Sequence, residues 1–170
     1  VREAYLSESH QDQYLAWSLA EAVGIDLWED AFARLEREPI DSMLYFQLMR
    51  TDDLSRVRRV IEFAEQRLPL TDIATGPEDA VGFGPEYKAH DCLDFILQEM
   101  KREGVFSDPL IAVGLRSPVI RNRNMAAAAL EAHPVSAWGE RIREALHKTV
   151  NDECSEELRE RFRGLINRSL

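Results

Sequence analysis

The sequence predicts an all-α protein, an α-α superhelix of about four helical hairpins in a single domain covering residues 1–170. Apolar residues recur every three or four positions in nine segments, as they do in helices that bury one face. No segment alternates apolar and polar residues in the way that a half-buried strand does. All connections but one are short, so consecutive helices are expected to pack antiparallel as hairpins.

Capping residues and helix breakers delimit the four N-terminal helices. The first covers residues 11–23, and Gly24 suits its end. Asp26 and Asp41 each precede a segment with helical periodicity, and we expect them to cap the next two helices. A fourth helix is predicted from about Asp53 to Leu68. The first helix has an apolar side that consists of Tyr14, Leu15, Leu19 and Val23.

The one long connection covers residues 69–86 and contains three prolines and three glycines. It has no helical period and is predicted to be a loop. Loops of this length in compact domains are usually functional or disordered. Five further helices are predicted over residues 87–102, from Asp108 to a corner at Ser117, from Pro118 to Leu130, after Ser136, and over residues 153–168.

The sequence contains an internal repeat of a helix, a polar corner and a second helix. Residues 44–51 (LYFQLMRT) align with residues 110–117 (LIAVGLRS) at an offset of 66. Beyond the corner, residues 56–64 align with residues 121–129 at an offset of 65. Recurrence of one supersecondary unit is typical of repeat architectures, which stack such units side by side.

The second helix of the repeat carries arginine, then alanines and a leucine, most clearly in RNMAAAAL at residues 123–130. This pattern resembles the second helix of HEAT and armadillo-type repeats. The resemblance implies that Arg58 and Arg123 are structural, each bridging to an acidic group or a carbonyl of the adjacent repeat.

A second resemblance covers LRSPVIRNRNMA at residues 115–126, with CLDFILQEM upstream at residues 92–100. This block is similar to a segment of bacterial proteins labelled limonene hydroxylase. A hydroxylase must activate oxygen through haem, flavin or non-haem iron. The chain has no haem-thiolate cysteine loop, no glycine-rich dinucleotide motif and no clear set of two histidines and a carboxylate, so we predict no cofactor.

Charge and composition restrict the partners. The chain has 31 acidic and 21 basic residues, a net charge of -10, which opposes binding to nucleic acid or to anionic membranes. Cys92 and Cys154 lie too far apart for a zinc motif, and two cysteines fit a reducing compartment. The N-terminus has no secretion-signal pattern, so we expect a cytoplasmic protein. The chain begins with Val1, which suggests a processed chain or a piece of a longer protein.

The candidate binding residues form two groups. Arg121, Asn122 and Asn124 lie in the first turns of one second helix, and Arg56 has the matching place in the other copy. Arginine pairs bidentately with carboxylates and phosphates, and the second helices of stacked hairpins line a concave surface. We therefore expect a protein or peptide partner there, with Phe83 of the long loop as a second contact. The alternative role for the polar residues 121–124 is structural, as a ladder of hydrogen bonds between helices that fixes how the repeats stack.

An enzyme on the same scaffold is the alternative function. His90 and Asp91 resemble the adjacent His–Asp pair with which the helical HD phosphohydrolases bind metal, although that site needs a further histidine from an earlier helix. Helical spacing also puts His90 at the edge of an apolar face, where it would simply be packed. HEAT-like folds also host bilin lyases and alkylpurine DNA glycosylases, and the acidic charge disfavours DNA. The sequence leaves the oligomeric state open.

Overall fold

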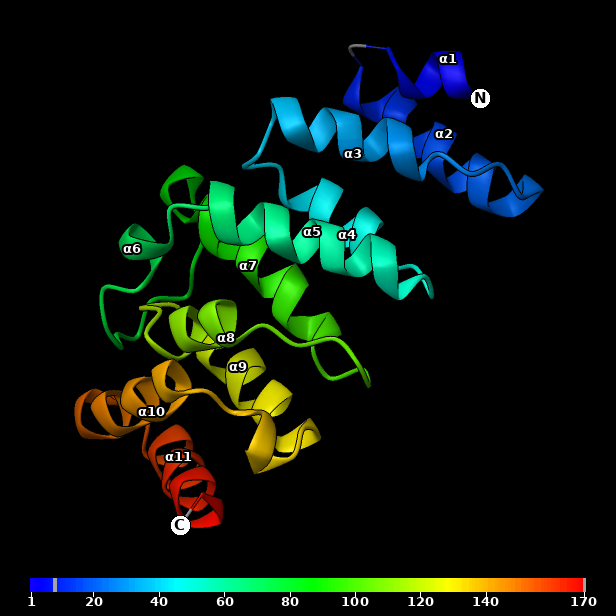
Figure 1. The fold of residues 1–170 in the computed structure, drawn as a ribbon. Coiled ribbons are helices and arrows are strands. Elements are labelled where there is room, and N and C mark those ends of the chain that lie inside the picture. The colour runs from blue at the N-terminus through cyan, green and yellow to red at the C-terminus, as the bar shows by residue number, and fades with distance from the viewer. Residues whose placement is uncertain (8, 170) are drawn as a thin grey trace. The chain divides into compact units, whose positions relative to one another are not determined.

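The computed structural model describes residues 1–7 and 9–169, which form helices, loops and one isolated β-bridge (Figure 1). The all-α prediction is therefore confirmed. The chain divides into two compact units, residues 1–38 and 39–170, and the number of domains stays a prediction. No helix within the described ranges has the length and apolar character needed to cross a membrane.

The first unit contains α1 (Arg2–Tyr5), α2 (His10–Val23) and α3 (Trp28–Arg37). Its core includes Tyr5, which is fully buried, and Trp28, which stacks on Phe32 with ring centroids 5.2 Å apart. Asp26 is predicted to cap α3, but the N-cap residue is Leu27, whose side chain makes no capping bond. The Asp26 carboxylate still accepts a hydrogen bond (2.9 Å) from the N–H of Trp28 and so stabilises the first turn. Gly24 ends α2 in the left-handed conformation, with φ of 72°.

The apolar side predicted for α2 is exposed. The helix instead buries Ala16 and Ala20. Helix α2 packs on α1. The exposed fractions on the apolar side are 58% for Tyr14, 56% for Leu15, 51% for Leu19 and 58% for Val23.

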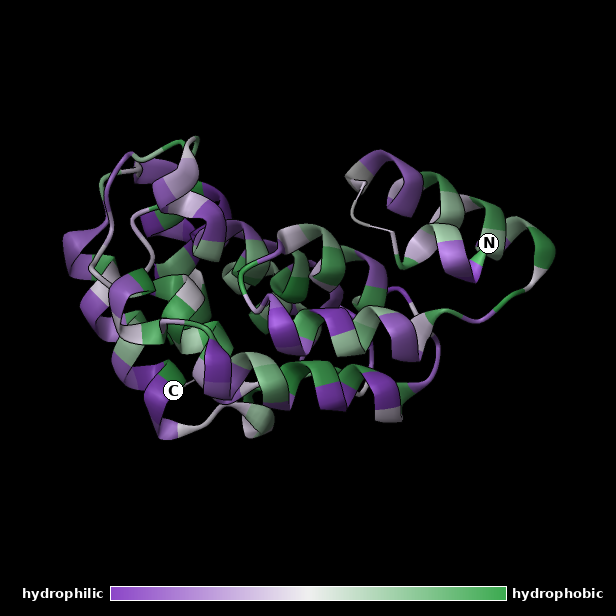
Figure 2. Ribbon diagram, turned by 90° about the horizontal axis from the view of Figure 1, so that it is seen from above, coloured by the Kyte–Doolittle hydropathy of each residue, from purple (hydrophilic) through white to green (hydrophobic). Residues whose placement is uncertain are grey.

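The second unit consists of helical hairpins. Its α-helices are α4 (Ser42–Met49), α5 (Leu54–Arg67), α6 (Leu70–Ile73), α7 (Lys88–Glu99), α8 (Asp108–Leu115), α9 (Ile120–Ala132), α10 (Glu140–Asp152) and α11 (Glu156–Arg168), with short 3₁₀ helices η1 (Pro85–Tyr87) and η2 (Val135–Ala137). Helices α4 and α5, α8 and α9, and α10 and α11 pack as pairs. In addition α8 packs on α10, and α9 on α11 (Figure 1). Figure 2 shows both hydrophobic and hydrophilic residues along the helices, and the strongly amphipathic helices of this unit are α5, α7, α10 and α11.

Helix bounds in this unit follow the internal repeat. Adding the offset of 66 to the bounds of α4 (42 and 49) gives 108 and 115, which are the bounds of α8. Adding 65 to the last residue of α5 (67) gives 132, the last residue of α9. The first helix of the repeat therefore has the same length in both copies, 8 residues, whereas the second has 14 residues in α5 and 13 in α9.

Helix starts agree with the sequence at some places and differ at others. Asp41 caps α4 through its carboxylate, as predicted, and Asp53 caps α5 in the same way. The cap of α8 is Ser107 and not Asp108. The Asp108 carboxylate instead accepts a hydrogen bond (2.7 Å) from the N–H of Gly139, the residue before α10. Asp108 thus joins two neighbouring helix starts, and α10 begins later than a cap at residue 136 would give.

The long loop packs against the corner between α8 and α9. It begins with the short helix α6 and was predicted without structure of its own. The N–H of Gly76 donates to the carbonyl of Arg116 (2.8 Å), and Ala80 forms a parallel bridge with Val119. A Cβ at Gly82 would lie 2.8 Å from Val119 Cγ1, and φ there is +83°, so this approach needs glycine. The loop is therefore fixed to the corner at two places.

Candidate functional site

Asn122, which the sequence analysis assigns to the binding surface, is completely buried at the corner between α8 and α9. Its amide nitrogen donates to the backbone carbonyl of His90 on α7 (3.0 Å). Its amide oxygen accepts from the hydroxyl of Ser117 (2.9 Å). Asn122 thus connects three segments inside the protein and has no surface for a partner, because α7 covers it.

Ser117 and His90 are hydrogen-bonded but do not form a nucleophile and base. Ser117 Oγ lies 3.0 Å from His90 Nδ1 and also accepts from the N–H of Val119 (3.1 Å). Its single proton goes to Asn122, so the imidazole must donate the Nδ1 proton to the serine. In a serine nucleophile activated by histidine, the hydroxyl donates its proton to the imidazole, which is the opposite direction. Ser117 is also fully buried, and the group therefore fixes the corner.

His90 and Asp91 do not converge on a common point. The Asp91 carboxylate pairs with Arg121 (2.6 Å), whereas the ring of His90 faces Ser117. In the part of the chain that the structure describes, no three His, Cys, Asp or Glu side chains are placed to hold a metal ion. Burial lowers the pKa of His90, an effect opposed by Asn122 and Asp91. A neutral imidazole that stabilises the corner fits this geometry.

We expect replacement of His90 with glutamine to be less harmful at acid pH. The pKa of His90 is lower in the folded chain than its ordinary value of 6.5, so the unfolded chain binds the proton more readily. The stability that the neutral ring contributes is present above the unfolded pKa and is lost as pH falls through it. Urea unfolding should therefore show a smaller difference between wild type and His90→Gln at about pH 5 than at about pH 8. An equal difference at both values would contradict a buried neutral histidine.

Arg121 is half-exposed and already paired with two acids of α7. Its guanidinium lies 2.6 Å from Asp91 and 2.9 Å from Asp94. Asp94 is buried, and this burial raises its pKa against the opposing effect of Arg121. Because Asp91 and Asp94 already pair with Arg121 within the protein, its guanidinium would attract a partner carboxylate only weakly.

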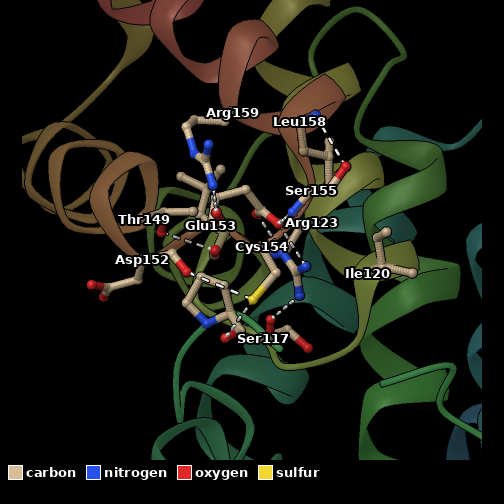
Figure 3. A network of polar contacts seen from close by, with 12 residues as sticks. Ser117, Ile120, Arg123, Thr149, Asp152, Glu153, Cys154, Ser155, Leu158 and Arg159 are labelled. Carbon is tan, nitrogen blue, oxygen red and sulfur yellow. Dashed lines mark hydrogen bonds and ion pairs between the residues drawn. The ribbon is translucent and has the colours of Figure 1, made fainter. Parts of the chain in front are cut away.

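Arg123 is completely buried in a polar network at the start of α9 (Figure 3). Its Nε and Nη2 donate to the two carboxylate oxygens of Glu153, at 2.7 and 2.9 Å. Its Nη1 donates to the carbonyls of Ser117 (2.8 Å) and Pro118 (2.9 Å). Glu153 also accepts from the N–H of Ser155, the cap of α11. One arginine thus joins its own corner to the connection between α10 and α11.

The remaining predicted residues lie apart from this network. Arg58, aligned with Arg123 in the repeat, is exposed, so the two arginines are not equivalent. Arg56 is half-buried and lies 3.9 Å from Asp53. Asn124 accepts from Arg161 of α11 (3.1 Å). Phe83 is 78% exposed on the loop. The structure therefore does not gather the five candidate binding residues into one surface.

A groove that the sequence analysis does not identify lies between α6, α8 and α10. Its volume is about 550 Å³. The floor is formed by small and aliphatic side chains that are half-buried or buried, and the rim carries charged side chains that are mostly exposed. The floor consists of Leu70, Ala74, Pro109, Ala112, Val113 and Ala145, and the rim of Thr71, Arg116, Arg141, Glu144 and Lys148. A groove with an apolar floor and a polar rim is typical of binding sites.

The rim has three basic side chains and one acidic one, in a chain whose net charge is -10. Arg116 is paired with Asp152 (2.8 Å). Arg141 and Lys148 are exposed, and neither forms a salt bridge with any residue that the structure describes. These two cations are therefore available to an anionic group in the groove.

Only part of this groove could be read in the sequence. Arg141, Glu144 and Lys148 follow the spacing i, i+3, i+7, which places them on one side of a helix. This signal could have located the rim. The floor comes from α6, α8 and α10, and α6 lies in the segment predicted as a loop.

Comparison of the chain with protein-family models, with curated proteins and with solved structures gives no match in any of the three.

Proposed function

We propose that this chain is a protein-binding module, and that a segment of a partner protein lies in the groove between α6, α8 and α10. The groove carries the proposal, because it combines an apolar floor with two unpaired cations at its rim. Apolar contacts supply binding energy at such sites, and charges supply orientation and association rate.

The proposed architecture is a superhelix of the HEAT or armadillo type. Its support is the repeat of helix bounds between α4 and α8, and the packing of α8 on α10 and of α9 on α11. Stacked hairpins of this kind present long surfaces that bind partner segments. The binding surface proposed here is formed by α6, α8 and α10, and it replaces the expected surface that included the buried Asn122.

Photo-crosslinking tests this function. A benzophenone amino acid at Thr71, an exposed rim position, should give a discrete adduct with a partner in the cells that make this protein. The same amino acid at Arg58, exposed on α5, serves as the control and should give none. Replacing Ala112 with arginine fills the floor and should remove the adduct at Thr71. Adducts from both positions, or from neither, would contradict the proposal.

A further inference from the structure

The charges along the groove rim alternate. Arg141, Glu144 and Lys148 lie on α10 at i, i+3 and i+7, and all three are exposed. We infer that the groove binds an amphipathic helix of a partner protein whose edge carries the opposite order, acidic, basic, acidic. This inference rests on the proposed function and specifies the chemistry of the partner.

Helix geometry fixes the spacing of the complementary charges. At a rise of 1.5 Å per residue, Arg141 and Lys148 are about 10.5 Å apart along α10. Two carboxylates seven residues apart on a helix lying alongside have the same separation. A basic residue between them meets Glu144. The motif is Glu-x-x-Lys-x-x-x-Glu for a parallel helix and Glu-x-x-x-Lys-x-x-Glu for an antiparallel one.

A helix fits this groove better than an extended segment. An extended peptide can bind as a polyproline II segment in a groove lined by aromatic side chains, and no aromatic residue that the structure describes lines this groove. It can also bind by adding a strand to an exposed sheet edge. The described residues offer no such edge, because their one β-bridge, between Ala80 and Val119, is isolated. The shallow floor of Ala112, Val113 and Ala145 instead accepts the apolar side of a helix at close range.

The acidic residue on the rim excludes uniformly anionic ligands. Glu144 lies between the two cations and repels a polyanion that would span them. Nucleic acids and anionic membranes are also repelled by the net charge of -10. A free small anion would leave the apolar floor uncovered, so a mixed-charge protein helix matches both parts of the groove.

Designed peptides test the charge order. The peptides are helical, about fifteen residues long and labelled with fluorescein, and all have the same apolar face of alanine and leucine. One class carries either of the two motifs, and the other class carries the inverted order Lys, Glu, Lys. In fluorescence anisotropy with the full chain, the better acidic–basic–acidic peptide should bind about tenfold more tightly than the inverted one. The double variant Arg141→Glu, Lys148→Glu should reverse this preference. The control variant Arg58→Glu, Lys88→Glu changes the net charge equally at exposed positions outside the groove and should leave it unchanged. Circular dichroism verifies that each variant is folded.

Each outcome decides the inference. Equal binding of both peptide classes, or no reversal in the groove variant, would overturn it. So would the absence of peptide binding up to about millimolar concentration. If the Thr71 adduct still forms in those cases, the groove binds a protein by other chemistry and only the inference fails. If the adduct is absent as well, the proposed function fails with it.

Discussion

Replacing Arg123 with methionine should lower the free energy of unfolding by about 3–5 kcal/mol, because it leaves a buried carboxylate without its partner. Arg123 and Glu153 have fully buried side chains and share two hydrogen bonds. The substitution also removes the donor to the carbonyls of Ser117 and Pro118. Urea unfolding monitored by circular dichroism gives the difference.

Two further variants distinguish the effect of breaking the buried ion pair from the effect of removing any arginine charge. Arg163→Met removes an arginine that pairs with Glu160 at the surface of α11, where both side chains are more than half exposed. Its expected cost is below about 1 kcal/mol. The double variant Arg123→Met, Glu153→Leu removes both buried charges and should recover part of the loss. Similar costs for Arg123→Met and Arg163→Met would contradict the arrangement at the corner.

Replacing Asn122 with alanine should lower the free energy of unfolding by about 2–4 kcal/mol, because two buried polar groups each lose one hydrogen bond. These groups are the carbonyl of His90 and the hydroxyl of Ser117. Since Asn122 is fully buried, water cannot replace the lost amide without rearrangement. Thermal and urea unfolding measure the loss.

Asn124 is the matched control for Asn122. It lies on the same helix two residues later, is only half-buried, and makes a weak contact (3.4 Å) with the carbonyl of Ile120. It also accepts from Arg161, which keeps its carboxylate partner Glu131. Asn124→Ala should therefore cost less than about 1 kcal/mol. Equal losses for the two asparagines would show that Asn122 does not connect α7 to the corner.

Periodicity and capping residues were sufficient to predict the helical class and most helix positions. Asp41 and Asp53 act within two or three residues of the atoms they cap, so a short stretch of sequence contains the whole interaction. The start of α8 was missed because Ser107 and Asp108 are both good caps, and only the distant Gly139 decides between them. The exposed side of α2 depends likewise on contacts with α1.

The candidate site was harder to predict than the fold. Arg121, Asn122, Arg123 and Asn124 are adjacent and polar, yet two of them are fully buried and two are partly exposed. The elements that cover the buried pair are α7 and the connection before α11, both about thirty residues away in the sequence. The same holds for the groove, whose floor is assembled from three helices.

The pairing of Arg123 with Glu153 also limits how this protein can be dissected. A fragment that ended with α10 at Asp152 would contain Arg123 without its counter-ion Glu153. The buried guanidinium on α9 would then have no compensating charge. The two hairpins from α8 to α11 should therefore be treated as one cooperative segment. A cut before α8 would also break buried contacts, because Arg121 and Asn122 hold α9 to α7.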